Sequence, residues 1–164
     1  MPAVTGIAVS PMSEARWMEE ALALAEQAAA LGEVPVGAVI VRGGGVIGRG
    51  FNRPISSSDP TAHAEIEAIR DAARTVGNYR LPESEMYVTI EPCTMCTGAL
   101  VHARIARLIY GAPEPRAGAV CSQSRLLDAG HFNHRVSYEG GLLEARCAAL
   151  LQRFFQARRA ARQP

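Results

Sequence analysis

The chain has 164 residues, 48% hydrophobic and 20% charged, a composition typical of a globular protein and not of a disordered one. We expect one domain over residues 1–164, long enough to bury its own core. Its longest apolar runs are too short for a membrane span, and the N-terminus lacks the pattern of a signal peptide. The four cysteines do not suffice for a disulfide framework, which predicts a reducing, cytoplasmic location.

Charge is unevenly distributed, although the net charge is only +1. Residues 1–100 carry seven arginines and twelve acidic residues, whereas residues 101–164 carry ten arginines and four acidic residues. Every basic residue is an arginine. The basic C-terminal part predicts contact with a polyanion.

The first elements are a loose leader over residues 1–12 and then a helix. Ser13 is suited to cap this helix, and Gly32 is suited to end it after Leu31. Apolar residues recur at helical spacing along it, which predicts a core-facing side.

A β-hairpin is expected next. Residues 34–41 form an almost continuous β-branched run, typical of a strand that is covered on both faces. The glycines at 43–45 provide a turn into a second strand over residues 46–51. Asn52 follows that strand, either as an ordinary turn residue or as a group that contacts a ligand.

The main chemical signal is a His-x-Glu motif followed by Pro-Cys-x-x-Cys. His63 and Glu65 form the first motif, and Cys93 and Cys96 belong to the second. One imidazole and two thiolates are three ligands, a number that leaves a catalytic zinc with a fourth position open to water. Glu65 is then a carboxylate beside the metal that can carry protons. The combined pattern is the known signature of zinc nucleobase deaminases.

Two other interpretations of the cysteine pair remain open. A Cys-x-x-Cys can be a redox pair, but such a pair does not need His-x-Glu upstream. It can also be half of a structural zinc site, but that site needs a fourth ligand. The required spacing is absent for the other histidines and for Cys121 and Cys147. We expect Cys121 and Cys147 to be packing residues.

The flanking residues predict how the metal ligands are presented. Asp59 and Pro60 suggest an N-cap and a first helical position, for a helix that carries His63 and runs to about Arg74. Pro92 suggests the start of a second helix. Its N-terminal positive dipole would favour both thiolates.

The remaining elements alternate between strand and helix. Strands are expected at residues 86–90, 107–110 and 136–138, a short helix within 121–133, and a basic C-terminal helix over 142–162. This order predicts an α/β fold, a three-layer α/β/α sandwich with a central mixed five-stranded sheet.

From about Trp17 to Arg159, the chain resembles the bacterial tRNA-specific adenosine deaminases. Beyond the zinc motif, the similarity includes residues 33–39, 52–55, 59–66, 78–81 and 133–136, and Phe154-Phe155 followed by Arg158-Arg159. The resemblance implies a cytidine-deaminase-like fold, one zinc on His63, Cys93 and Cys96, and Glu65 as the proton shuttle. It also implies a homodimer that converts wobble adenosine to inosine in the anticodon stem-loop of tRNA.

Further site residues follow from the resemblance alone. Asn52 matches the residue that contacts the flipped base. The positions that match the anticodon-loop surface are Asn133, Phe155, Arg158 and Arg159. Glu114 stands where the family usually has Asp, and we expect it to accept a hydrogen bond from a ribose hydroxyl.

Two rival functions remain. The first is a deaminase of a free nucleobase or nucleoside, such as guanine or cytosine, which would not need the basic C-terminal helix. The second is a non-catalytic RNA-binding module with a structural zinc, which would not need Glu65.

Overall fold

The computed structural model describes residues 11–163, and most of the expected leader lies outside them. The first helix, α1, spans Pro11–Ala30 and so begins two residues before the expected cap at Ser13. Among the helices in the described part of the chain, none is both long and apolar enough to cross a bilayer.

Within residues 11–163, five strands form one mixed sheet, as predicted, and they lie across it in the order β2-β1-β3-β4-β5. Strand β1 pairs antiparallel with both β2 and β3, whereas β3, β4 and β5 are parallel to one another. The first strand begins three residues later than expected. The strands are β1 Gly37–Arg42, β2 Gly45–Phe51, β3 Glu85–Ile90, β4 Arg107–Ala112 and β5 Ser137–Gly140.

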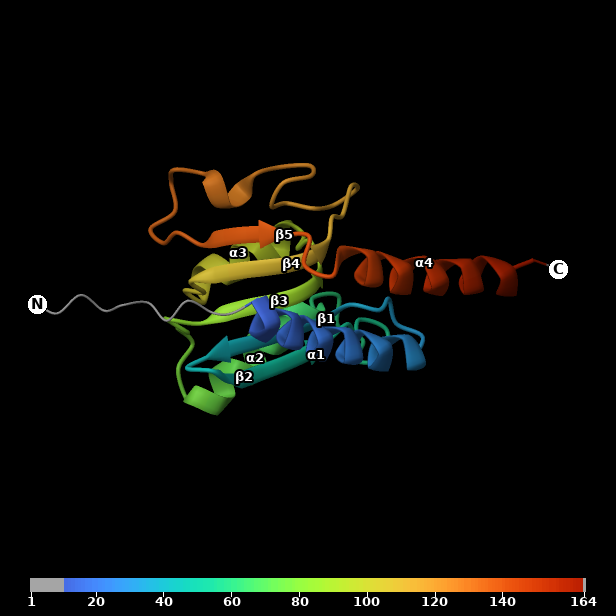
Figure 1. Ribbon diagram of the computed structural model, residues 1–164, viewed down its shortest axis with the longest axis horizontal. Coiled ribbons are helices and arrows are strands. Elements are labelled where there is room, and N and C mark those ends of the chain that lie inside the picture. Colours follow the sequence, from blue (N-terminus) through green and yellow to red (C-terminus); the bar gives the residue numbers. More distant parts are fainter. Residues whose placement is uncertain (1–10, 164) are drawn as a thin grey trace, which may run out of the picture.

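Helices cover both faces of the sheet, which confirms the three-layer architecture (Figure 1). Helices α2 (Ala64–Val76) and α3 (Thr94–His102) lie on one face, and α1 and α4 (Glu144–Ala161) lie on the other. Side chains alternate across a strand, so Ile40 packs in the core under α2 while Val39 packs in the core under α1. A short helix is expected within residues 121–133. The structure has a 3₁₀ turn there, η1, at Leu126–Asp128.

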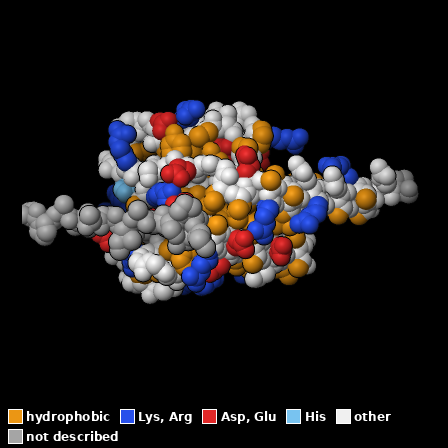
Figure 2. Space-filling model, in the orientation of Figure 1, with side chains coloured by type: hydrophobic (Ala, Val, Ile, Leu, Met, Phe, Trp, Pro, Cys, Tyr) orange, Lys and Arg blue, Asp and Glu red, His pale blue; other side chains and the backbone are white. Residues whose placement is uncertain are grey.

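The C-terminal helix α4 is buried against the rest of the fold only in its first half. Cys147 and Leu150 are buried against the sheet and α1. Beyond them the helix projects past the body of the molecule, with arginine side chains along it (Figures 1 and 2). Phe155, on this projecting part of α4, is 40% exposed.

Glycine allows α2 to approach the hairpin closely. A Cβ on Gly48 of β2 would lie 2.5 Å from the carbonyl oxygen of Ala68 and 2.7 Å from the amide nitrogen of Ala72. These are backbone atoms of α2, which cannot move aside independently. The position of α2, and with it the start of that helix, therefore depends on a missing side chain.

We predict that Gly48→Ala lowers the free energy of unfolding by about 1–3 kcal/mol, the usual cost of overpacking. Urea denaturation measures the change. Gly45→Ala in the same strand is the matched control, because a Cβ there meets no atom within 4 Å. It should change stability by no more than about 0.5 kcal/mol. Equal effects of the two substitutions would show that close packing on α2 is not the cause.

Candidate metal centre

Two helices begin at the same edge of the sheet, and their first residues carry the metal-binding motif. His63 is the N-cap residue of α2, which follows β2. Cys93 is the N-cap residue of α3, which follows β3, and Cys96 lies in the first turn of α3. An N-cap residue has extended backbone while its neighbour is already helical. Each of these side chains can therefore reach past the helix end.

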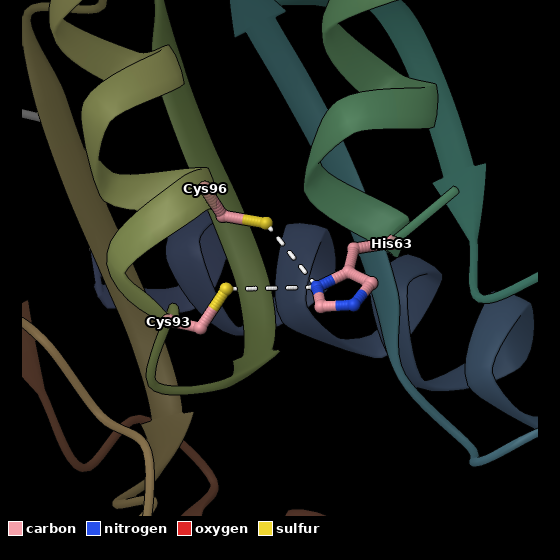
Figure 3. Close-up of side chains that lie close together, drawn as sticks. All are labelled: His63, Cys93 and Cys96. Atoms are coloured by element: carbon pink, nitrogen blue, oxygen red, sulfur yellow. Dashed lines mark hydrogen bonds between the residues drawn. The ribbon is translucent and has the colours of Figure 1, made fainter. Parts of the chain in front are cut away.

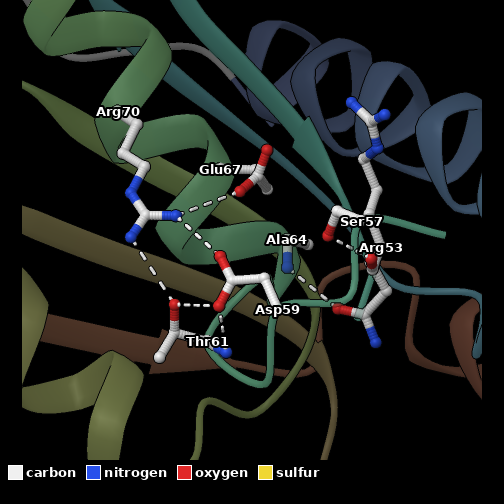
Figure 4. A network of polar contacts seen from close by, with 8 residues as sticks. Arg53, Ser57, Asp59, Thr61, Ala64, Glu67 and Arg70 are labelled. Atoms are coloured by element: carbon white, nitrogen blue, oxygen red, sulfur yellow. Dashed lines mark hydrogen bonds and ion pairs between the residues drawn. The ribbon is translucent and has the colours of Figure 1, made fainter. Parts of the chain in front are cut away.

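The predicted N-cap at Asp59 is wrong, because α2 begins five residues later. The Asp59 carboxylate accepts hydrogen bonds from the Thr61 amide at 2.9 Å and the Thr61 hydroxyl at 2.7 Å (Figure 4). It also pairs with Arg70 at 3.3 Å. These local bonds stabilise a turn in place of a helix start.

Asn52 supplies the missing cap from a distance. Its Oδ1 accepts a hydrogen bond from the Ala64 amide at 2.9 Å, one of the amides that the helix itself leaves unpaired. A residue at the end of β2 thereby fixes the start of α2, between His63 and Glu65.

The three predicted ligands converge with the spacing that zinc requires. Nδ1 of His63 lies 3.6 Å from Sγ of Cys93 and 3.5 Å from Sγ of Cys96 (Figure 3). A tetrahedral zinc bonded to sulfur and nitrogen at its usual distances would hold the two ligand atoms about 3.6 Å apart. In the described part of the chain, these side chains form the one group of three or more potential ligands. The donor set and its geometry fit one zinc ion.

The pKa values of the two thiols in this group shift in opposite directions. A hydrogen bond from Cys96, helped by the nearby His63 imidazole, lowers the pKa of Cys93 to about 4. The same hydrogen bond, together with burial, raises the pKa of Cys96. Both sulfurs must be deprotonated to bind a metal, so Cys96 would lose its proton when zinc binds.

Glu65 lies in the first turn of α2, beside the ligands but outside their group. Its side chain is only 3% exposed, and burial raises the pKa of its carboxyl. A raised pKa makes the protonated carboxyl easier to form, and an acid–base catalyst must be able to take up a proton as well as release it.

A cavity of about 170 Å³ brings together five of the predicted site residues. Its walls are formed by Val34, Val36, Asn52, His63, Glu65, Ile90, Glu91, Cys93, Glu114 and Ala117. Sites for drug-sized ligands enclose about 300–1,000 Å³, so this cavity suits a single heterocyclic ring system.

The other predicted contact residues lie outside the cavity. Asn133 is exposed in the segment between η1 and β5, and Phe155 and Arg159 are exposed on α4. Arg158 lies against Phe154, 4.9 Å from the ring centroid, and donates a hydrogen bond to the carbonyl oxygen of Gly32 at 3.1 Å. The structure therefore separates a small reaction cavity from a basic outer region.

Glu91 is a cavity residue that the sequence analysis missed. It lies between β3 and Cys93, and its side chain is only 2% exposed. Burial acts to raise its pKa, but hydrogen bonds from Cys121, Ser122 and Glu114 outweigh this effect and lower it. The sequence signal that could have indicated Glu91 is an acidic residue directly after an apolar strand.

The Cytidine and deoxycytidylate deaminase zinc-binding region matches residues 11–112 of this chain. The tRNA-specific adenosine deaminase of Haemophilus influenzae is 49% identical over 145 residues, which cover 88% of this chain and 84% of that protein. The enzyme of the same name from Agrobacterium fabrum is 46% identical over 143 residues, covering 87% and 94%.

Solved structures agree with these matches. One, from studies of A-to-I editing by tRNA:A34 deaminases at the wobble position of transfer RNA, has a TM-score of 0.81 and 46% identity. The match covers 83% of this chain and 99% of the chain in that structure. A guanine deaminase from Nitrosomonas europaea, with a TM-score of 0.75 at 22% identity and coverage of 94% and 97%, shares the fold alone. The chain belongs to the tRNA-specific adenosine deaminases, among the proteins with the cytidine and deoxycytidylate deaminase zinc-binding region.

Proposed function

We propose that this protein hydrolyses adenosine to inosine at the wobble position, position 34, of tRNA. One observation carries the proposal. A three-ligand zinc site and a buried carboxylate that is not a ligand share a cavity of single-ring-system size, in a chain 49% identical to a tRNA-specific adenosine deaminase. Three protein ligands with an open position are typical of catalytic zinc, not of structural zinc.

In this proposal Glu65 moves the protons of the reaction. Bound zinc supplies a water molecule with a pKa lowered towards neutrality. As the water oxygen bonds to C6 of adenine, Glu65 accepts one proton from the water and delivers it to the ring nitrogen. It then carries the second proton, from the new C6 hydroxyl, to the amine, and the C6–N bond breaks as ammonia leaves. Burial at 3% exposure keeps bulk water from competing for these protons.

Asn52 and Glu114 would hold the nucleoside. The Oδ1 of Asn52 is already bonded to the Ala64 amide, so its NH₂ is the group that it can present to a base. Oε1 of Glu114 accepts a hydrogen bond from the Arg116 amide at 2.8 Å, which leaves Oε2 for a ribose hydroxyl.

The outer residues would bind the anticodon stem-loop. Asn133, Phe155, Arg158 and Arg159 offer a polar contact, a stacking ring and two charges for the backbone of the loop. The bases of an anticodon loop are already unpaired, so moving one into the cavity costs less than it would from a duplex. The proposal treats residues 1–164 as one deaminase domain, with 142–162 as its basic helix, in a cytoplasmic homodimer.

A free nucleobase deaminase is the second candidate, because the cavity alone would also hold a free base such as guanine or cytosine. The test is to incubate the protein with an anticodon stem-loop carrying a wobble adenosine and to measure inosine by mass spectrometry. Guanine, cytosine and a hairpin with adenosine only in its stem are the controls. Ammonia release from a free base, without inosine in the stem-loop, would favour the second candidate.

We predict that Cys93→Ser lowers the zinc content well below one ion per chain, because a hydroxyl is a poor substitute for a thiolate ligand. Metal analysis of the purified protein measures it. Cys147→Ala is the control, since Cys147 packs in the core on the opposite face of the sheet. Undiminished zinc in the Cys93 variant would contradict the ligand assignment.

We predict that Glu65→Gln retains zinc and RNA affinity but lowers kcat by about a hundredfold to ten-thousandfold, the usual contribution of an acid–base group. Glutamine keeps the shape of the side chain but cannot transfer the proton. Single-turnover kinetics on the stem-loop measure the loss. Turnover within a few-fold of the unmodified protein would show that another group moves the proton.

We predict that Arg159→Gln weakens stem-loop binding and reduces the slope of log affinity against log salt by about 0.7–0.9 for each lost phosphate contact. Arg159 is preferable to Arg158 because Arg158 also bonds the body of the protein through Gly32. Arg146→Gln on the same helix is the control, since Arg146 pairs with Glu19 at 2.8 Å. Equal slopes for the two variants would count against a phosphate contact at Arg159.

A further inference from the structure

The loop that follows β4, residues 113–125, forms one wall of the cavity through Glu114 and Ala117. A loop exposes backbone amides that no helix or sheet satisfies. In this loop, four of those amides point to a single buried side chain, the carboxylate of Glu91.

Both carboxylate oxygens of Glu91 accept hydrogen bonds from the loop. Oε2 accepts the amides of Val120, Cys121 and Ser122 at 3.1, 2.9 and 2.9 Å. Oε1 accepts the amide of Glu114 at 3.1 Å and the hydroxyl of Ser122. The 120–122 end of the loop is thus held by both oxygens, and the cavity-lining end is held by Oε1 alone.

We propose that Glu91 is a positioning residue that holds the 113–125 loop as the substrate-facing wall of the cavity. In doing so it sets where Glu114 meets the nucleoside. The inference deepens the proposed tRNA deamination and rests on it for the identity of the substrate. Glu91 does not contact the reacting atoms. It acts through its hydrogen bond to the backbone amide of Glu114.

The backbone next to Glu91 reinforces the arrangement. The amide of Glu91 donates to the carbonyl oxygen of Ala112 at 2.8 Å, and the carbonyl oxygen of Pro92 accepts the amide of Ala119 at 2.9 Å. The loop is therefore tied at its start and at its middle to the segment that leads into Cys93. This places the wall of the cavity in a fixed relation to the metal ligands.

Gly118 is required by the same carboxylate. A Cβ at this position would overlap Cδ and Oε2 of Glu91 and would lie 2.6 Å from the carbonyl oxygen of Glu114. The amide of Gly118 also donates to that carbonyl at 2.9 Å. The loop can close over Glu91 only because residue 118 has no side chain.

Glu91→Gln tests the proposal with little change in shape. Glutamine has one oxygen, which can still accept the three amides of residues 120–122. Its NH₂ must then face the amide of Glu114, donor against donor. The substitution should release the end of the loop that faces the substrate and leave the other end bonded.

The expected result has two parts. Hydrogen exchange by mass spectrometry should show loss of protection in peptides that contain Glu114, with β3 and β4 unchanged. KM for the stem-loop should rise about tenfold while kcat changes less than threefold and zinc stays at one ion per chain, since a misplaced wall weakens binding first. Asp128→Asn is the matched control, because Asp128 accepts hydrogen bonds from Tyr138 away from the cavity.

Unchanged protection at Glu114 together with an unchanged KM would overturn the proposal. So would a fall in kcat alone, which indicates a smaller active fraction and a merely structural role. Should wild-type protein not act on the stem-loop, the exchange measurement still decides the role of Glu91 independently of the substrate.

A second variant covers the case in which Glu91→Gln does not fold. Gly118→Ala should displace the carboxylate and produce the same exchange pattern and the same rise in KM. Gly130→Ala, in the same connection between β4 and β5, is its control, because a Cβ there meets nothing within 4 Å. Equal behaviour of the two alanine variants would overturn the proposal.

Discussion

The site depends on two helix N-termini that meet at one edge of the sheet. His63 is the N-cap residue of α2 and Cys93 is the N-cap residue of α3. Both ligands therefore lie where a helix leaves amides unpaired. The positive ends of the helices favour thiolates over thiols, and the two thiolates offset the charge of a zinc dication. Because β1 pairs with both β2 and β3, the strands that lead to these helices are held at a fixed separation.

Buried carboxylates hold the loops around this site. Glu91 accepts four amides from the loop after β4. Glu33, 1% exposed, accepts the amides of Ile55 and Ser56 at 3.1 and 2.8 Å, in the segment between β2 and α2. A buried charge is tolerated only when several donors surround it, so each carboxylate requires its loop to adopt one arrangement. Loops held in this way can form the walls of a cavity without regular secondary structure.

The basic C-terminal helix shows how a local pattern can be only partly informative. Its apolar residues recur at helical spacing, yet α4 is buried only at Cys147 and Leu150. The rest projects from the sheet, and within residues 11–163 none of its side chains is buried (Figure 1). Exposed aromatic and basic side chains on a projecting helix suit a large, flexible polyanion better than a small substrate.

The sequence by itself determined the ligand set, the order of strands and helices, and the layered fold, because these follow from motif spacing and from hydrophobic periodicity. The prediction of an N-cap at Asp59 failed, because side-chain hydrogen bonds within a turn outcompete a helix cap there. For Asn52, the sequence left two roles open, a turn residue or a ligand contact. Tertiary structure alone decided that Asn52 caps α2 and that Glu91 holds a loop 23 to 31 residues further along the chain. Contacts of this kind join segments distant in sequence. Their energy depends on which amides the fold leaves unpaired, and no local pattern records that.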